Sequence, residues 1–523
     1  MVVVDVSWLL SVSTLGIYLH SIFVSITLGL PLVIAPMLYK WWRTKDEDYY
    51  RAAKVATGVL AVNFALGVIT GTLVEFGLVQ AWSGSIFVIA TYAFAPLAIE
   101  LGAFIGEVVL LILFIVTLKR VRPSLSLGVL LGYIVFAVFS GMLITGVNSW
   151  LQVPWGTGEV ASVLYPFLPS YGPQVTDVQA LVKVKLALLN NLLAGTPPSM
   201  ILQNSTVAQS VGITLKEPFV ALSSPYALAS MLHNVTAGMT IGASIGVLGF
   251  AFQYLKTGSF VYRKLLRAVL PVLLLLLIVQ PVVFGDFMGK MVAAYQPTKF
   301  AMIEGIHQTT QNPLIAFLAY GDPAKPIVGF DAFRNASSKL NGTSLGDVAS
   351  TVIPGVDSGK ASTIDLGGLG ASDLSKAEAR IELLNPAYYV KIASGVIALI
   401  SVVALTALLY RAGPISRLTN TIIRPLGERR AVLIFALLML IGSVFAAVIG
   451  WYVREAGRKP WTVYGLVYPE EIVTPVQIEP AVLGGFALLF TAVSLVGIYG
   501  MYIVSTKPSR FTDLLRRSVA EEK

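Results

Sequence analysis

The sequence predicts an all-α polytopic membrane protein with nine transmembrane helices, an outside N-terminus and a cytoplasmic C-terminus. Hydrophobic residues make up 56% of the 523 residues and charged residues only 12%, whereas soluble globular chains carry about 25% charged residues. Apolar runs of about 18 or more residues, long enough to cross a bilayer as helices, recur along the chain. The chain has no cysteine, which excludes disulfides, cysteine-ligated zinc and cysteine-ligated iron–sulfur clusters.

The nine apolar segments are separated by short basic loops and by two long polar segments. The first apolar segment is long enough to span the membrane rather than be removed as a signal peptide, and no basic region precedes it. The predicted spans cover about residues 8–39, 55–79, 93–118, 125–147, 225–255, 265–286, 387–410, 430–453 and 480–505.

Three regions follow from this pattern. Residues 1–286 hold the first six helices with a long loop at 148–224, residues 287–386 form a second long loop, and residues 387–523 hold the last three helices and a tail. Residues 354–373 (PGVDSGKASTIDLGGLGASD) are rich in Gly, Ser and Asp, which predicts a flexible surface loop.

The distribution of Lys and Arg predicts the orientation. The first, third, fifth and seventh loops and the C-terminal tail are basic, whereas residues 80–92 contain no Lys or Arg. Basic loops stay in the cytoplasm, so both long loops are predicted to lie outside. Arg454, Arg458 and Lys459 are the exception, since they lie close to the membrane on the predicted outer side; this placement favours a role in binding acidic groups. Because the basic residues lie in short loops between spans, the net charge of +9 does not indicate nucleic-acid binding.

Two of the three histidines, His20 and His233, lie inside predicted spans. An ionisable ring in hydrocarbon needs a partner, a water-filled cavity or a metal, and imidazole is the usual axial ligand of haem iron. The alternative is a histidine that packs between helices and bonds to a neighbouring carbonyl.

Acidic residues in the spans favour redox or proton chemistry. Glu100 and Glu107 are seven residues apart, so they share one helical face about 10.5 Å apart along the axis. Such a pair could relay protons or serve as structural hydrogen-bond donors. Glu455 follows Trp451 by four residues on one face, with Arg454 next to it. A proton-coupled transporter would need the carboxylates but gives no reason for two membrane histidines.

Six segments in a fixed order carry a resemblance to a known family. In these six segments the chain resembles subunit I of the cytochrome bd-type quinol oxidases, which also has nine spans and an outside N-terminus. The resemblance covers most of the chain and is weak over about 156–217 and 310–385. The segments are IYLHSIFVSITLGL, NFALGVITGTLVEF, FAPLAIE, NSWLQVP, QPTKFAMIEG and GWYVREAGRKPW.

The resemblance implies ligands for three haems. It implies that His20 ligates one haem of a dihaem oxygen site and that Glu455 is associated with the second haem there. It implies that His233 ligates a low-spin b-type haem, and that Glu100 and Glu107 take part in haem coordination or proton delivery. The family spaces this glutamate pair by eight residues, where this chain has seven.

The resemblance also implies the remaining site residues. Lys299 and Glu304 match quinol-binding residues of the family's external quinol-binding loop, here 287–386. Trp451 and Arg458 are expected to line the cofactor, with Arg458 facing haem propionates, because a guanidinium fork fits a carboxylate.

The activity implied is oxidation of quinol at the outer face and reduction of oxygen to water with protons from the cytoplasm. The cofactors implied are one or two haem b groups and either haem d or a b-type substitute. The expected location is the cell membrane of a prokaryote, in contact with lipid. The expected partners are a membrane subunit resembling the family's subunit II or subunit I, and a small single-span subunit.

Two departures from the family pattern concern electron entry. The family has Arg-Ile-Met at the start of span seven, with Met as the second ligand of the low-spin haem, where this chain has Lys391, Ile392 and Ala393. Leu10 stands near the place of an early arginine. Three outcomes stay open: a haem held by His233 alone, a nearby Met as replacement ligand, or no haem there. Two other functions stay open as well: a degenerate paralogue with an accessory role, and a haem-free proton-coupled transporter.

Overall fold

The computed structural model describes residues 6–82, 93–118, 120–194, 219–411, 425, 427–473 and 479–506, without the side chains of residues 6, 7, 75–81 and 191. Within these ranges nine helices are long and apolar enough to cross a membrane, and each overlaps one predicted span. Several basic residues used to predict the orientation, namely Lys119, Arg417, Arg424 and the tail from Lys507, lie outside the described residues.

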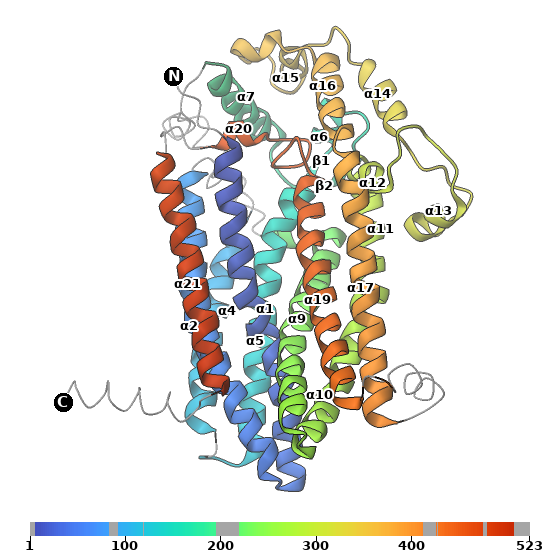
Figure 1. Ribbon diagram of the computed structural model, residues 1–523. Coiled ribbons are helices and arrows are strands. Elements are labelled where there is room, and N and C mark those ends of the chain that lie inside the picture. Colours follow the sequence, from blue (N-terminus) through green and yellow to red (C-terminus); the bar gives the residue numbers. More distant parts are fainter. Residues whose placement is uncertain are drawn as a thin grey trace, which may run out of the picture.

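The spanning helices run side by side in one bundle (Figure 1). Some begin earlier or end later than the apolar pattern predicts, because a helix continues past the hydrocarbon wherever its backbone hydrogen bonds continue. Thus α2 begins at Glu47, with two acidic residues in its first turn, where they favour the positive end of the helix dipole. The helices are α1 (Val6–Thr44), α2 (Glu47–Ala81), α4 (Phe94–Thr117), α5 (Pro123–Gln152), α9 (Pro225–Thr257), α10 (Phe260–Val279) continued by η3 and α11, α17 (Ile381–Tyr410), α19 (Glu428–Ala456) and α21 (Pro480–Thr506).

The sixth span contains a wider helical turn. After α10 the chain forms a π-helical turn, η3 (Gln280–Gly285), and then α11 (Asp286–Tyr295). Pro281 lies in this turn; it has no backbone N–H to donate, and its ring disturbs regular α-helical bonding. Such turns often occur at functional sites. The span therefore extends to Tyr295, beyond the predicted end at residue 286.

Glycines set the closest contact between α1 and α9. A methyl group on Gly242 of α9 would lie 2.1 Å from the Ser25 carbonyl oxygen of α1, and one on Gly29 of α1 would lie 2.4 Å from the Ala243 nitrogen. The two backbones therefore touch directly, as small residues allow in membrane helices. This contact holds the helix of His20 against the helix of His233.

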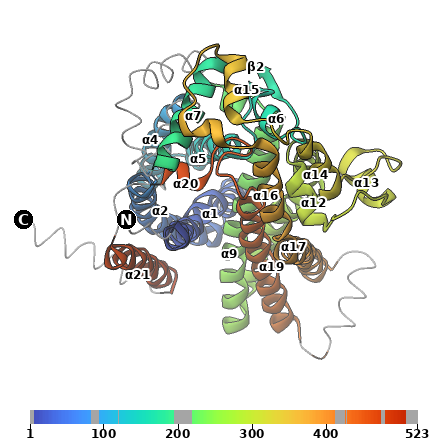
Figure 2. The same ribbon diagram turned by 90° about the horizontal axis from the view of Figure 1, so that it is seen from above.

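The described parts of both long loops fold together at one end of the bundle, which we call the loop end (Figures 1 and 2). These parts form short helices and one antiparallel strand pair. Near this end lies α20 (Pro469–Ile472), which follows α19. The loop elements are β1 (Thr157–Gly158), α6 (Val160–Leu164), β2 (Tyr171–Gln174), α7 (Val178–Ala194), η2 (Val220–Leu222), α12 (Pro297–Glu304), α13 (Pro313–Tyr320), α14 (Phe330–Ser338), α15 (Leu345–Val352), η4 (Gly359–Thr363) and α16 (Leu366–Glu378).

The prediction of a flexible loop over residues 354–373 is wrong. Much of this stretch lies in η4 and α16. The Asp365 side chain caps α16 by accepting a hydrogen bond from the Gly368 N–H, and Leu366 and Leu374 are fully buried against the rest of the loop end. The prediction failed because it used the polar composition alone and did not consider an N-cap followed by apolar residues at helical spacing.

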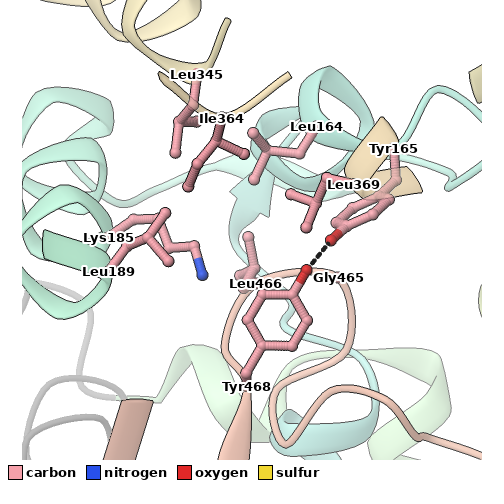
Figure 3. A pocket seen from close by; sticks show the side chains of 10 residues that line it. All are labelled: Leu164, Tyr165, Lys185, Leu189, Leu345, Ile364, Leu369, Gly465, Leu466 and Tyr468. Atoms are coloured by element: carbon pink, nitrogen blue, oxygen red, sulfur yellow. Dashed lines mark hydrogen bonds between the residues drawn. The ribbon is translucent and has the colours of Figure 1, made fainter. Parts of the chain in front are cut away.

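A buried polar cluster joins three segments of the loop end. The Tyr165 hydroxyl donates to Asp373 Oδ2 at 2.6 Å and lies 2.5 Å from the Tyr468 hydroxyl. Burial raises the pKa of Asp373, against the effect of both tyrosine hydrogen bonds. Beside the two tyrosines lies a cavity of about 20 Å³, also lined by Lys185 and Leu189 (Figure 3). It has room for about one water molecule, so it is too small for a quinone ring.

Candidate functional site

A buried group of charged side chains lies where α19 ends near the loop end. Arg458 Nη2 donates to Glu455 Oε2 at 2.5 Å, and Gln152 Nε2 donates to Glu455 Oε1 at 3.2 Å. The Arg454 guanidinium carbon lies 5.1 Å from the centroid of the Trp451 ring. The end of α19 therefore brings Trp451, Glu455 and Arg458 into one cluster.

Several arginine nitrogens in this cluster are buried and have no hydrogen-bond acceptor among the residues that the structure describes. Nε and Nη1 of Arg454 and Nε and Nη1 of Arg458 are in this state, and Arg454 Nε lies 3.8 Å from Glu455 Oε1, beyond hydrogen-bond distance. Leaving buried donors of a charged group unpaired is costly. An acidic group bound at this place would satisfy them, so these residues fit the carboxylates of a haem.

Lys299 belongs to the same buried network. It lies on α12, is 2% exposed, and donates to Gln152 Oε1 at 3.1 Å, to Gln296 Oε1 at 3.1 Å and to the Arg454 carbonyl at 2.9 Å. Burial, with a smaller effect of nearby Arg454, holds the pKa of Lys299 well below its usual range. The Gln152 amide thus bonds to Lys299 through its oxygen and to Glu455 through its nitrogen.

Glu304 lies on another face of α12. The Tyr389 hydroxyl donates to Glu304 Oε2 at 2.9 Å, and Asn385 Nδ2 donates to the Ile303 carbonyl at 2.8 Å. Burial raises the pKa of Glu304, although the Tyr389 hydrogen bond acts in the opposite direction. Residues five apart on a helix point about 140° away from each other. Lys299 therefore faces the buried network while Glu304 faces α17.

The His20 ring is oriented by a hydrogen bond to α2. His20 Nδ1 lies 3.0 Å from Thr70 Oγ1, and this hydroxyl donates to the Leu66 carbonyl at 3.0 Å. Because the hydroxyl proton is used there, Nδ1 carries the imidazole proton and Nε2 keeps a free lone pair. A neutral imidazole held in this way is the form that ligates a metal. Gly71 makes room for the ring, since a methyl group there would lie 3.0 Å from His20 Cε1.

His233 lies beside the π-helical turn of the sixth span. The Gln280 amide is 3.3 Å from His233 Nδ1, and the charges of Lys391 and Arg454 act on the ring. Ala393 is exposed on α17, and its methyl side chain offers no donor atom. Position 393 therefore supplies no haem ligand.

The carboxylates of Glu100 and Glu107 both face α5. Ser140 Oγ donates to Glu100 Oε1 at 2.7 Å, and Glu107 is 4% exposed beside Tyr133. Ser140 and Tyr133 are also seven residues apart, on a helix that runs antiparallel to α4. The two carboxylates therefore form a row of polar groups along the contact between these helices.

Sequence reasoning assigned no role to several residues of these sites. Gln152 and Gln296 lie in the NSWLQVP and QPTKFAMIEG segments, so the segments pointed to them. No sequence signal distinguished Thr70 and Tyr389, because their partners lie 50 and 85 residues away in the chain.

Together these features define a class of protein: a membrane-spanning helix bundle with a buried group of charged side chains near one end. Residues 11–508 match the family described as Cytochrome bd terminal oxidase subunit I, and the chain belongs to this family. The chain is an integral membrane protein, with nine apolar helices in its described residues.

Individual relatives show moderate similarity. The "Putative cytochrome bd menaquinol oxidase subunit I" of Bacillus subtilis is 24% identical over 310 residues, which is 58% of either chain. The "Cytochrome bd-II ubiquinol oxidase subunit 1" of Escherichia coli is 23% identical over 93% of this chain and 91% of its own length. A chain in "The structure of bd oxidase from Geobacillus thermodenitrificans" has the same fold, with a TM-score of 0.66 and 19% identity over 95% of this chain and 98% of that chain.

Proposed function

We propose that this chain is the haem-carrying subunit of a terminal oxidase that oxidises quinol at the loop end, which faces outward, and reduces oxygen to water. The observation that carries the proposal is the group of buried Arg454 and Arg458 donors without acceptors around Glu455. Family membership supports it, as do the relatives whose names state menaquinol or ubiquinol oxidase.

Three residues would ligate haem iron: His20 and His233 through their imidazoles, and Glu455 through its carboxylate. Arg454 and Arg458 would hold the acidic groups of the cofactor. When bound, haem supplies electron transfer and oxygen reduction. The cofactors would be one or two haem b groups and either haem d or a b-type substitute.

Quinol would lose its protons beside α12. Glu304 accepts a proton from the quinol hydroxyl, and the Tyr389 hydroxyl positions the carboxylate for this transfer. Lys299, enclosed behind Glu304 on the other side of α12, tunes the site electrostatically and is bonded through Gln152 to Glu455.

Protons for oxygen reduction would enter from the opposite end of the bundle. Because α4 begins near the loop end, Glu107 lies farther from that end than Glu100 does. A proton would reach Glu107 first and Glu100 next, along the polar row on α5. Releasing quinol protons outside and taking up protons from the cytoplasm separates charge across the membrane.

This function implies a multi-pass protein in the cell membrane of a prokaryote. Its partners would be lipid, quinol, a membrane subunit resembling the family's subunit II or subunit I, and a small single-span subunit.

The test uses the complete complex purified from membranes. We expect a pyridine haemochrome assay to show haem, a reduced-minus-oxidised spectrum to show its reduction by quinol, and an electrode to record oxygen uptake driven by quinol. His20→Ala should abolish uptake and change the spectrum. A complex without haem would contradict the proposal, and so would uptake that His20→Ala leaves unchanged.

A second function, an accessory subunit that keeps haem without oxidase activity, is favoured by Ala393. If position 393 faces the haem of His233, Ala393→Met should supply a thioether ligand and convert a high-spin spectrum to low-spin. Leu488→Met, exposed on a different spanning helix, α21, is the matched control and should change nothing. An unchanged spectrum in Ala393→Met would show that position 393 does not face this haem.

A further inference from the structure

The helix α13 is strongly defined by its sequence, QNPLIAFLAYGDP. The Asn312 side chain caps it by accepting a hydrogen bond from the Ile315 N–H at 3.2 Å, and Pro313 occupies its first turn. Gly321 ends it with a φ of +73°, a conformation that glycine adopts readily. The eight residues of α13 carry no charge, so this is a short, well-capped and wholly apolar or aromatic helix.

Within the described part of this chain, one side of α13 is buried and the other side is exposed. Ala316 and Ala319 are 0% and 8% exposed, whereas Leu314, Phe317 and Leu318 are 67%, 56% and 54% exposed. The side chains that face the bundle are therefore the smallest apolar ones, and the largest point away from it. A helix in water would be expected to show the opposite arrangement.

The position of α13 explains this arrangement. It packs against α11, which forms the last ten residues of the membrane span Phe260–Tyr295. Figure 1 shows α13 beside the bundle, at the height of the upper parts of α17 and α21 and below α14, α15 and α16. Figure 2 shows it at the periphery. The exposed face thus lies at the height of the upper ends of neighbouring membrane spans.

The residues after α13 suit a membrane surface. Asp322 and Lys325 follow the helix in an exposed loop, and Lys325 Nζ lies 4.3 Å from the centroid of the Tyr320 ring. Tyrosine is enriched at membrane–water boundaries, where lysine extends its ammonium group toward water. The charged residues therefore follow directly after the apolar helix.

We propose that α13 is an interfacial helix that inserts Leu314, Phe317 and Leu318 into the lipid at the membrane surface and so anchors the loop that follows Glu304. The occupant of the exposed face is lipid, because α13 packs against the last part of a membrane span, and Leu383 and Val390 of α17 are large apolar side chains exposed on another span. An apolar helix lying in the boundary region of a bilayer is a known mode of membrane attachment.

The absence of cysteine from the chain allows a direct test. Phe317→Cys would be labelled with a nitroxide in the complete complex in lipid vesicles, and its collisions with oxygen and with a water-soluble nickel chelate would be measured by electron paramagnetic resonance. Labelling of the complex with the unchanged chain gives the background. Ile400→Cys is the lipid-facing control on α17, and Ser338→Cys is the exposed control on α14.

We expect the label at position 317 to collide preferentially with oxygen, as at Ile400→Cys. Collisions with the nickel chelate as frequent as at Ser338→Cys would overturn the proposal, since the face would then lie in water. Protection from both reagents would overturn it too, because a protein partner would then cover α13. Leu314→Cys gives the same test if Phe317→Cys fails to assemble.

Discussion

At the scale of single residues, Gln152 connects Lys299 to Glu455 in the candidate site. It is fully buried, its oxygen accepts a hydrogen bond from Lys299 and its nitrogen donates one to Glu455. Lys299 and Glu455 lie far apart in the sequence. The position of Glu455 therefore depends on an uncharged side chain from another helix.

Replacing Gln152 should destabilise this network. Gln152→Leu keeps much of the volume but removes both hydrogen bonds, and leaving buried polar partners unsatisfied costs about 1–3 kcal/mol. We expect a lower thermal midpoint of the purified complex and a changed haem spectrum. Gln311→Leu, at an exposed position, is the control and should leave both unchanged. A Gln152→Leu complex with the original midpoint and spectrum would show that the network does not hold Glu455.

The raised pKa of Glu304 predicts a pH dependence of quinol oxidation. Only the ionised carboxylate can accept a proton, so kcat/KM for quinol should rise as the pH passes upward through this raised pKa, and then level off. Tyr389→Phe removes a hydrogen bond that favours the ionised form, so the rising limb should move to higher pH.

Two substitutions check the assignment of this limb. Glu304→Gln should lower kcat/KM by about 10²- to 10⁴-fold, the usual contribution of a general base. It should also abolish the rise of kcat/KM with pH. Glu382→Gln, exposed in the first turn of α17, should change neither. If kcat/KM still rises with pH in Glu304→Gln, the rise comes from the titration of another group.

At the scale of elements, the contact between α1 and α9 decides how the two histidine-bearing helices are spaced. Gly242→Ala would place a methyl group 2.1 Å from the Ser25 carbonyl oxygen, so the helices would have to separate. Such overpacking costs about 1–3 kcal/mol. We expect a lower thermal midpoint and a lower yield of assembled complex.

Gly249→Ala is the matched control for this prediction. It lies on the same helix, and a methyl group there would meet no atom within 4 Å. It should leave the midpoint unchanged or raise it slightly, because alanine favours helix over glycine. Equal effects of the two substitutions would mean that the α1–α9 contact is not tight.

The elements differ in how far the sequence predicts them. The nine spans were predictable because apolar length is a local property of the chain. Residues 354–373 were mispredicted because the cap at Asp365 and the burial of Leu374 are invisible in composition. In the site, His20 and Glu455 stood out as ionisable groups near the membrane. The sequence did not single out Thr70, because it comes from another helix, and it singled out Gln152 only as part of NSWLQVP, without its contact to Glu455.

At the scale of the whole molecule, the bundle is asymmetric along its axis. The described parts of both long loops lie at the loop end, together with α12 (Figure 1), which carries Lys299 and Glu304. The Glu455 cluster lies near this end, at the end of α19. Glu107 lies farther toward the other end than Glu100. Under the proposed function, quinol protons leave at the loop end and protons for oxygen reduction enter from the other end. The direction of charge separation therefore depends on which end faces outward, and the basic loops predict that it is the loop end.

Cysteine labelling can decide the orientation, because the chain has no cysteine of its own. Ser338→Cys on α14 lies at the loop end, and Thr257→Cys lies at the opposite end, where α9 ends; both positions are exposed. In spheroplasts, a membrane-impermeant maleimide should label Ser338→Cys, whereas Thr257→Cys should react only after the cells are broken. The reverse pattern would place quinol oxidation on the cytoplasmic side, and quinol protons would then be released into the cytoplasm, which would contradict the proposed direction of charge separation.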